Sequence, residues 1–145
     1  PAVSPLLRVH TFRPTDEGVA FLVDCGGTVI YHAGDLNNWT WKGEPDSWNH
    51  SMAANYHREL KKIREVLDGW GKEIDIAFVP LDGRLEENFY LGLDDFMRQV
   101  GAKRVFPMHC WDDYSVIGAL KSMPESEPYR ERIVRITGDG DSFEL

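Results

Sequence analysis

The feature that most constrains this sequence is a change of hydrophobic period partway along the chain. Between residues 47 and 68, apolar side chains recur every three or four positions, which is the repeat of an amphipathic helix. This stripe consists of Met52, Tyr56, Leu60, Ile63, Leu67 and Trp70. Residues 74–80 then form a short, nearly continuous apolar run, which is typical of a strand buried on both faces. A chain that alternates these two patterns is expected to form a layered α/β sheet.

The alternation continues on both sides of this boundary. Cys25-Gly26-Gly27 separates two β-branched and aromatic runs and predicts a tight antiparallel hairpin. In chain order, the further predicted elements are strands 7–12, 18–24 and 28–32, helix 88–100, strand 104–108, a helix near 114–122 and a final strand near 132–137. No repeat, low-complexity tract or linker divides the sequence, which predicts a single domain over residues 1–145.

Charge and cysteine content exclude several classes of function. The chain has 16 Lys and Arg against 24 Asp and Glu, for a formal net charge of −8. Proteins that bind nucleic acids or membrane surfaces use basic stripes to contact phosphates, so neither partner is expected here. The expected partner is instead a small-molecule substrate. No stretch approaches the roughly 20 apolar residues that span a bilayer. Cys25 and Cys110 form no CxxC pair, and so few cysteines predict a reducing, cytoplasmic location.

Two side chains with metal-binding chemistry directly follow predicted strands. Asp35 comes after residues 28–32, and His109 comes after residues 104–108. A carboxylate and an imidazole are good ligands for a divalent metal, and rigid strands fix their directions. Each residue also has a plainer interpretation, because Asp35 could be a turn residue or helix cap and His109 a core histidine with satisfied hydrogen bonds. Their spacing alone leaves both interpretations open.

The segments around these residues resemble the metallo-β-lactamase superfamily. Ile30-Tyr31-His32-Ala33-Gly34-Asp35 and the later Phe106-Pro107-Met108-His109 match a strand that ends in Gly-Asp and a strand that ends in His. In that superfamily the aspartate bridges two metals, and the histidine binds the second one. The resemblance therefore implies that Asp35 is a catalytic residue and metal ligand, and that His109 is a metal ligand. The longer string His-Ala-Gly-Asp-Leu-Asn-Asn-Trp, with the later His-Cys-Trp-Asp, is similar to an uncharacterised prokaryotic branch of the superfamily.

This resemblance implies a fold and an activity. The fold would be half of an αββα sandwich, with a mixed sheet and helices on one face, and the activity would be metal-dependent hydrolysis. Water would be activated by one or two divalent ions, zinc by default, with manganese or iron also used in the superfamily. The superfamily signature His-x-His-x-Asp-His is absent, although the chain has five histidines.

In relatives that signature lies in the N-terminal half, so this chain resembles the C-terminal half. Pro1 in place of an initiator Met also favours a fragment or a processed chain. The expected partner is the N-terminal half of the same protein or another copy of the chain. A rival hypothesis is a non-catalytic half-domain that acts only with a partner chain. The complete protein is expected to be a metallo-hydrolase, and whether these residues alone are an enzyme stays open.

Weaker candidates surround the two predicted ligands. His10 could be a third metal-site histidine or a surface strand residue, and His32 could support the site or pack on its strand. Three tryptophans could line a pocket or serve packing, namely Trp39, Trp41 and Trp111. Cys110 is expected to face the core. Asp82 and Arg84 could form an ion pair or contact substrate, and the sequence leaves both possibilities open.

Overall fold

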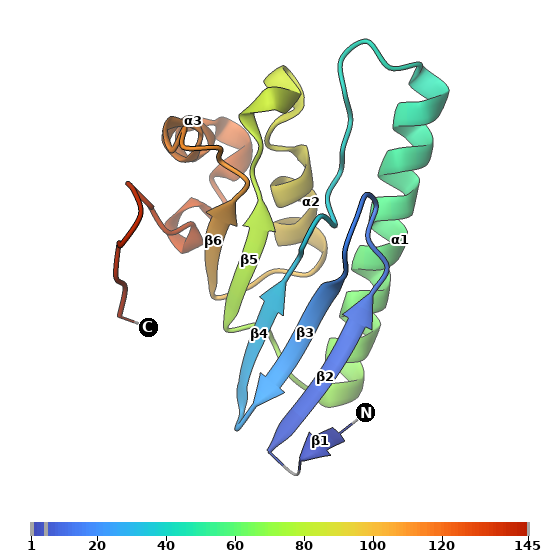
Figure 1. The fold of residues 1–145 in the computed structure, drawn as a ribbon, viewed down its shortest axis with the longest axis vertical. Coiled ribbons are helices and arrows are strands. Elements are labelled where there is room, and N and C mark those ends of the chain that lie inside the picture. Colours follow the sequence, from blue (N-terminus) through green and yellow to red (C-terminus); the bar gives the residue numbers. More distant parts are fainter. Residues whose placement is uncertain (1, 5, 145) are drawn as a thin grey trace.

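A computed structural model describes residues 2–4 and 6–144, with side chains from Leu6 onward. In this part of the chain, six strands form one mixed sheet whose order follows the sequence (Figure 1). The strands are β1 (Ala2–Ser4), β2 (Leu7–Phe12), β3 (Ala20–Cys25), β4 (Thr28–His32), β5 (Ile76–Pro80) and β6 (Arg104–Met108). Strands β1 to β4 pair antiparallel, whereas β4, β5 and β6 run parallel to one another. The carboxyl ends of these last three strands therefore lie at the same edge of the sheet.

Helices α1 (Asp46–Trp70) and α2 (Leu91–Gln99) cover one face of this sheet (Figure 1). Helix α3 (Ser115–Ser122) packs near β6, and three short 3-10 helices complete the described chain, namely η1 (Gly83–Asn88), η2 (Pro124–Ser126) and η3 (Arg130–Arg132). The α1 stripe predicted from the sequence is mostly buried in the core, where Tyr31 of β4 stacks on Phe96 of α2 with ring centroids 5.1 Å apart. None of the helices in the described residues is long and apolar enough to cross a membrane.

The second face of the sheet carries apolar side chains, and no helix among the described residues covers it. Strand pairing places Val23, Ile30 and Ile76 side by side on this face, and Phe78 beside Phe106 in the next row. The chain near its C-terminus crosses part of this face, where Phe143 meets Phe106 edge-on with centroids 5.4 Å apart. A mixed sheet with helices on one face confirms the predicted α/β class and agrees with half of an αββα sandwich.

The predicted final strand, residues 132–137, is wrong. Only Ile133 forms a bridge, to Val105, and the preceding residues form η3. Lys121 Nζ donates to the Ile133 carbonyl at 2.9 Å, and the Thr137 N–H donates to the Asp141 carboxylate at 2.7 Å. These side chains take up backbone groups that a strand would have used for its ladder.

Candidate functional site

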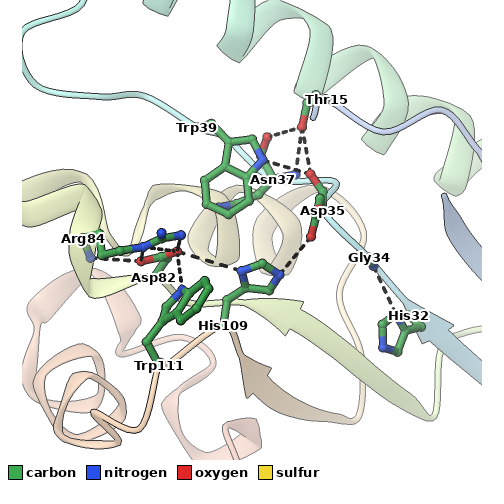
Figure 2. A network of polar contacts seen from close by, with 10 residues as sticks. All are labelled: Thr15, His32, Gly34, Asp35, Asn37, Trp39, Asp82, Arg84, His109 and Trp111. Carbon is green, nitrogen blue, oxygen red and sulfur yellow. Dashed lines mark hydrogen bonds and ion pairs between the residues drawn. The ribbon is translucent and has the colours of Figure 1, made fainter. Parts of the chain in front are cut away.

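Three charged or titratable residues follow the parallel strands at their shared edge. Asp35 comes after β4, Asp82 after β5 and His109 after β6. Asp35 Oδ1 lies 2.9 Å from His109 Nε2, and the two side chains are 32% and 25% exposed (Figure 2). The sequence prediction that Asp35 and His109 lie close together is therefore confirmed, while their metal binding stays a prediction.

Asp35 is held in a tightly bonded loop. Gly34 adopts a φ of +54°, which an L side chain rarely takes, and so lets the chain turn out of β4. The Asp35 carbonyl accepts a hydrogen bond from Trp39 Nε1 at 2.9 Å. The Thr15 hydroxyl donates to the Asn37 carbonyl at 2.7 Å and accepts from the Asn37 N–H at 3.0 Å. These bonds hold the backbone of the loop and do not involve the Asp35 carboxylate. The carboxylate faces His109 (Figure 2).

Asp82 is a fully buried carboxylate with three kinds of donor around it. Arg84 donates from its backbone N–H at 3.0 Å, and its guanidinium binds both carboxylate oxygens, with Nη2 at 2.5 Å from Oδ2. Trp111 Nε1 donates to Oδ2 at 3.2 Å. Burial raises the pKa of Asp82, but the hydrogen bonds from Arg84 and Trp111 outweigh it, so the pKa is lowered and the group is charged. The ion pair left open by the sequence is thus formed.

The His109 ring lies between these two carboxylates (Figure 2). Its Nε2 faces Asp35, and its Nδ1 lies 3.9 Å from Asp82 Oδ2, which is too long for a hydrogen bond. This Nδ1 atom is buried and has no hydrogen-bond partner among the described residues.

The backbone of the loop after β6 is strained. His109, Trp111 and Asp112 have φ values of +64°, +51° and +62°, in the left-handed region that disfavours non-glycine residues. Such conformations cost free energy and persist where the surrounding structure holds them, which is common at functional sites. The strained loop therefore sets both His109 and Trp111 in place.

A cavity of about 430 Å³ opens beside Asp35 and His109. Four of its ten lining residues are tryptophans, and it also reaches Arg84. The lining residues are Thr15, Asp16, Asp35, Trp39, Trp41, Trp48, Met52, Arg84, His109 and Trp111. The three tryptophans named from the sequence as possible pocket residues all lie here.

The other histidines considered from the sequence lie elsewhere. His32 is exposed on the open face of the sheet, with its ring 5.7 Å from that of Phe78, and its Nδ1 accepts from the Gly34 N–H at 3.1 Å. Figure 2 shows His32 turned away from Asp35. His10 is exposed on β2, with its ring 4.8 Å from that of Phe12. The interactions of the described residues do not join either histidine to Asp35 or His109.

Cys110 points into the core, as predicted. Its side chain is buried, and burial, with Asp113 nearby, raises its pKa to about 11. A thiol with a raised pKa is a poor nucleophile near neutral pH. Its role is packing.

Sequence reasoning left two features of the site unassigned. Asp82 was given no position beside His109, although the argument from strand ends that selected Asp35 and His109 applies equally to the residue after β5. Trp48 belongs to the first turn of α1, and no sequence signal connected that turn to the loop after β6. Only the folded chain brings them together.

The site contains part of the ligand set that a metal requires. A carboxylate oxygen and an imidazole nitrogen in contact are suitable donors for a divalent ion. In the described residues, however, no group of three or more His, Cys, Asp or Glu could hold a metal. A tight zinc site usually has three or four protein ligands. The donor atoms of Asp35 and His109 are therefore suitable for a divalent metal, but the described residues supply too few ligands for a tight site.

Comparison with known proteins found a distant relative of matching chemistry. A UPF0173 metal-dependent hydrolase of Alkaliphilus metalliredigens is 28% identical to this chain over 122 residues. The match covers 77% of this chain and 40% of that relative, so the chain spans well under half of the relative's length. No protein-family model matches the chain, and no solved structure matches it significantly. The match agrees in part with the resemblance identified from the sequence.

Proposed function

We propose that this chain is the C-terminal part of a metal-dependent hydrolase, in which Asp35 and His109 are metal ligands. The observation that carries the proposal is the 2.9 Å contact between Asp35 Oδ1 and His109 Nε2 at the ends of two parallel-running strands. The name of the distant relative supports the same class of reaction. The substrate is a small molecule.

The proposed roles follow from the chemistry of each side chain. Asp35 would be the catalytic carboxylate and a metal ligand, and His109 would contribute Nε2 to the same metal site. Oxygen and nitrogen donors suit zinc, and manganese or iron accept the same set. A bound ion lowers the pKa of water and polarises the carbonyl or phosphoryl oxygen of the scissile bond. The charged Asp82 favours a proton on Nδ1 of His109, which leaves the Nε2 lone pair available.

The remaining ligands are proposed to come from the N-terminal half of the same protein or from another copy of the chain. The shortage of ligands among the described residues supports this. The apolar sheet face supports it as well, because exposed apolar surface of this kind is normally covered by another layer. Phe21 on this face is 39% exposed. The two cysteines are free thiols, which supports a reducing compartment, the cytoplasm.

The same shortage of ligands favours a second candidate function. If no partner supplies the missing donors, the chain is a non-catalytic half-domain that binds another protein. The two candidates differ in whether the assembled protein holds a stoichiometric metal ion.

Light scattering coupled to size exclusion, followed by zinc titration of the same fractions, tests the proposal. We expect the isolated chain to bind zinc weakly and to hydrolyse nothing, and the chain assembled with its partner to hold stoichiometric zinc. Ester, lactone, thioester and phosphodiester substrates then define the reaction. A folded monomer that holds stoichiometric zinc tightly would contradict the proposal that the chain carries only part of the metal site. An assembled protein that binds no zinc would contradict the hydrolase and support the non-catalytic half-domain.

A further inference from the structure

Four of the five tryptophans in the chain line the cavity beside Asp35 and His109. They come from three separate segments: Trp39 and Trp41 follow β4, Trp48 lies in the first turn of α1, and Trp111 follows β6. Trp39, Trp41 and Trp48 lie within ten residues of one another in the sequence, whereas Trp111 is distant from them, so the fold is needed to bring Trp111 to the other three indoles. The fold gathers them at one place.

Two of these indoles are unusually exposed. Trp111 is 65% exposed and Trp48 is 40% exposed, whereas Trp39 is only 4% exposed. Core packing accounts for Trp39. It does not account for Trp48 and Trp111, because exposed rings contribute little of the stabilisation that burying an indole gives. Exposed aromatic side chains that border a concave site are typical of ligand recognition.

The rings are arranged as surfaces for stacking. Trp39 and Trp41 are nearly parallel, with an interplanar angle of 9° and centroids 6.3 Å apart. The Arg84 guanidinium lies over the Trp111 ring, 4.4 Å from its centroid, and 5.9 Å from that of Trp41. Trp39 also lies against His109, with centroids 5.7 Å apart. A ligand in the cavity would therefore meet both the indole rings and the Asp35–His109 pair.

We infer that the cavity binds the substrate through a flat aromatic ring, stacked on these indoles and placed next to the bond to be hydrolysed. This inference rests on the proposed function, because it assigns the substrate class of the same site. Flat rings gain most from stacking on indole faces, in offset or edge-on geometry. The volume of about 430 Å³ is in the range of small-molecule sites.

Arg84 distinguishes this ligand from a cation, which an aromatic cage could otherwise accept. The guanidinium already lies over the faces of Trp41 and Trp111, so a second positive charge would be repelled there. Arg84 binds Asp82 through Nε and Nη2, and the hydrogen bonds of the described residues make no use of its Nη1. That nitrogen is available to donate to an oxygen of the ligand, such as a carboxylate or carbonyl group.

The test uses three probes with the full 145-residue chain. The first is 2-naphthoate, the second is decahydro-2-naphthoate with the same charge but no flat ring, and the third is tetramethylammonium. The readout is the indole N–H signals in nitrogen–proton correlation spectra. Trp70, which lies under Arg8 at 4.7 Å from the guanidinium carbon, is an internal control outside the cavity.

We expect 2-naphthoate at millimolar concentration to shift the four cavity indoles and to leave Trp70 unchanged. The saturated analogue should bind at least about threefold more weakly, and the cation should cause no saturable shift. Trp48→Ala should weaken 2-naphthoate binding about threefold to tenfold. Phe21→Ala is a matched control, because Phe21 is 39% exposed on the far sheet face, and it should leave the affinity unchanged.

Three results would overturn the inference: cavity indoles that do not respond to 2-naphthoate, equal binding of the saturated analogue, or preferential binding of the cation. Zinc titration of the assembled protein separates this failure from failure of the proposed function. If the protein binds zinc but not 2-naphthoate, only the inference of an aromatic substrate is contradicted, and the proposed hydrolase function is not. Binding of 2-naphthoate without zinc supports the aromatic cavity and contradicts the hydrolase.

Discussion

Two buried carboxylates stand at opposite ends of the sheet with almost the same surroundings. Asp24 is 6% exposed near the β3–β4 turn, and Asp82 is 0% exposed after β5. Each is bound by an arginine that lies over a tryptophan ring. The pairs are Arg8 over Trp70 for Asp24 and Arg84 over Trp111 for Asp82.

The Asp24 cluster is complete in itself. Its carboxylate accepts from Arg8 at 2.6 Å, from Lys72 at 2.8 Å and from the Gly27 N–H at 3.1 Å. Hydrogen bonds from Lys72 and Arg8 lower the pKa of Asp24 to about 2. A carboxylate with two cations and a backbone donor ties the turn to β2 and to the end of α1. It is a structural device.

The Asp82 cluster is incomplete by comparison. The His109 Nδ1 beside it is buried without a hydrogen-bond partner, the backbone at His109 and Trp111 is left-handed, and a cavity adjoins them. Similar ion pairs therefore have different meanings. A cavity adjoins each cluster, so the unsatisfied His109 atom and the strained backbone, rather than the ion pair or the cavity, distinguish a functional site from a structural one.

The largest expected difference between the two ends is in metal binding. Asp35→Ala should lower the zinc affinity of the assembled protein by more than about a hundredfold and abolish turnover, because a lost ligand costs more than a lost supporting residue. Asp24→Ala should leave zinc stoichiometry intact, as measured by metal analysis after gel filtration. Unchanged stoichiometry and turnover in Asp35→Ala would make Asp35 a turn residue.

A change at Asp82 should have the next largest effect. Asp82→Asn keeps the shape but removes the charge that faces His109 Nδ1, so zinc affinity should fall about tenfold to a hundredfold. Competition with a chelator measures the affinity of the assembled protein. Asp24→Asn is the control, with no expected change in zinc affinity. Equal losses in the two variants would show that both clusters act only through the stability of the fold.

Two glycines extend the comparison to backbone stability. Gly34 has φ +54° and Gly26 has φ +59°, but a Cβ at Gly34 would lie 2.6 Å from the Val19 carbonyl oxygen, whereas one at Gly26 meets nothing within 4 Å. Gly26→Ala should cost about 1 kcal/mol from backbone strain alone, and Gly34→Ala about 2–4 kcal/mol. Urea unfolding compares the two variants. Equal midpoints would mean that the β4 turn moves freely away from Val19.

The smallest expected effect is a change in the stability of the fold at acidic pH. The pKa of Asp24 is lowered from 3.8 to about 2, so the stability it contributes is complete above its ordinary pKa and is lost as pH falls through about 2. Lys72→Met should move this loss to higher pH, and Asp24→Asn should remove it. Urea midpoints between pH 5 and pH 2 measure both effects. The same acid profile in all three proteins would contradict the assigned role of Lys72.

The sequence predicted the elements whose hydrophobic period is unambiguous. Strands 7–12 and 104–108 match β2 and β6, and the long helix extends only slightly beyond its predicted ends. Residues 132–137 were mistaken for a strand because their apolar pattern gives no sign of the Lys121 amine that binds the Ile133 carbonyl. The proximity of Asp35 and His109 was predictable because parallel strands align their ends.

Other parts of the site were not predictable from local patterns. The left-handed backbone at His109 was not predictable, because histidine adopts a positive φ more often than most residues but still only rarely. Trp48 and Trp111 line the same cavity although one lies in the first turn of α1 and the other in the loop after β6. Neighbours that depend on such long-range placement leave no periodic trace in a sequence.

The mixed sheet also sets the order in which the site can be assembled. Strands β2, β3 and β4 join through short antiparallel connections, which close at low entropic cost. Strands β5 and β6 are added to β4 only after crossovers through α1 and α2, and such non-local pairing is slow. Asp35 therefore belongs to the part of the sheet that closes early, and His109 to the part that closes last. On this order of assembly, Asp35 meets His109 only when β6 docks, so we expect the pair to form late in folding.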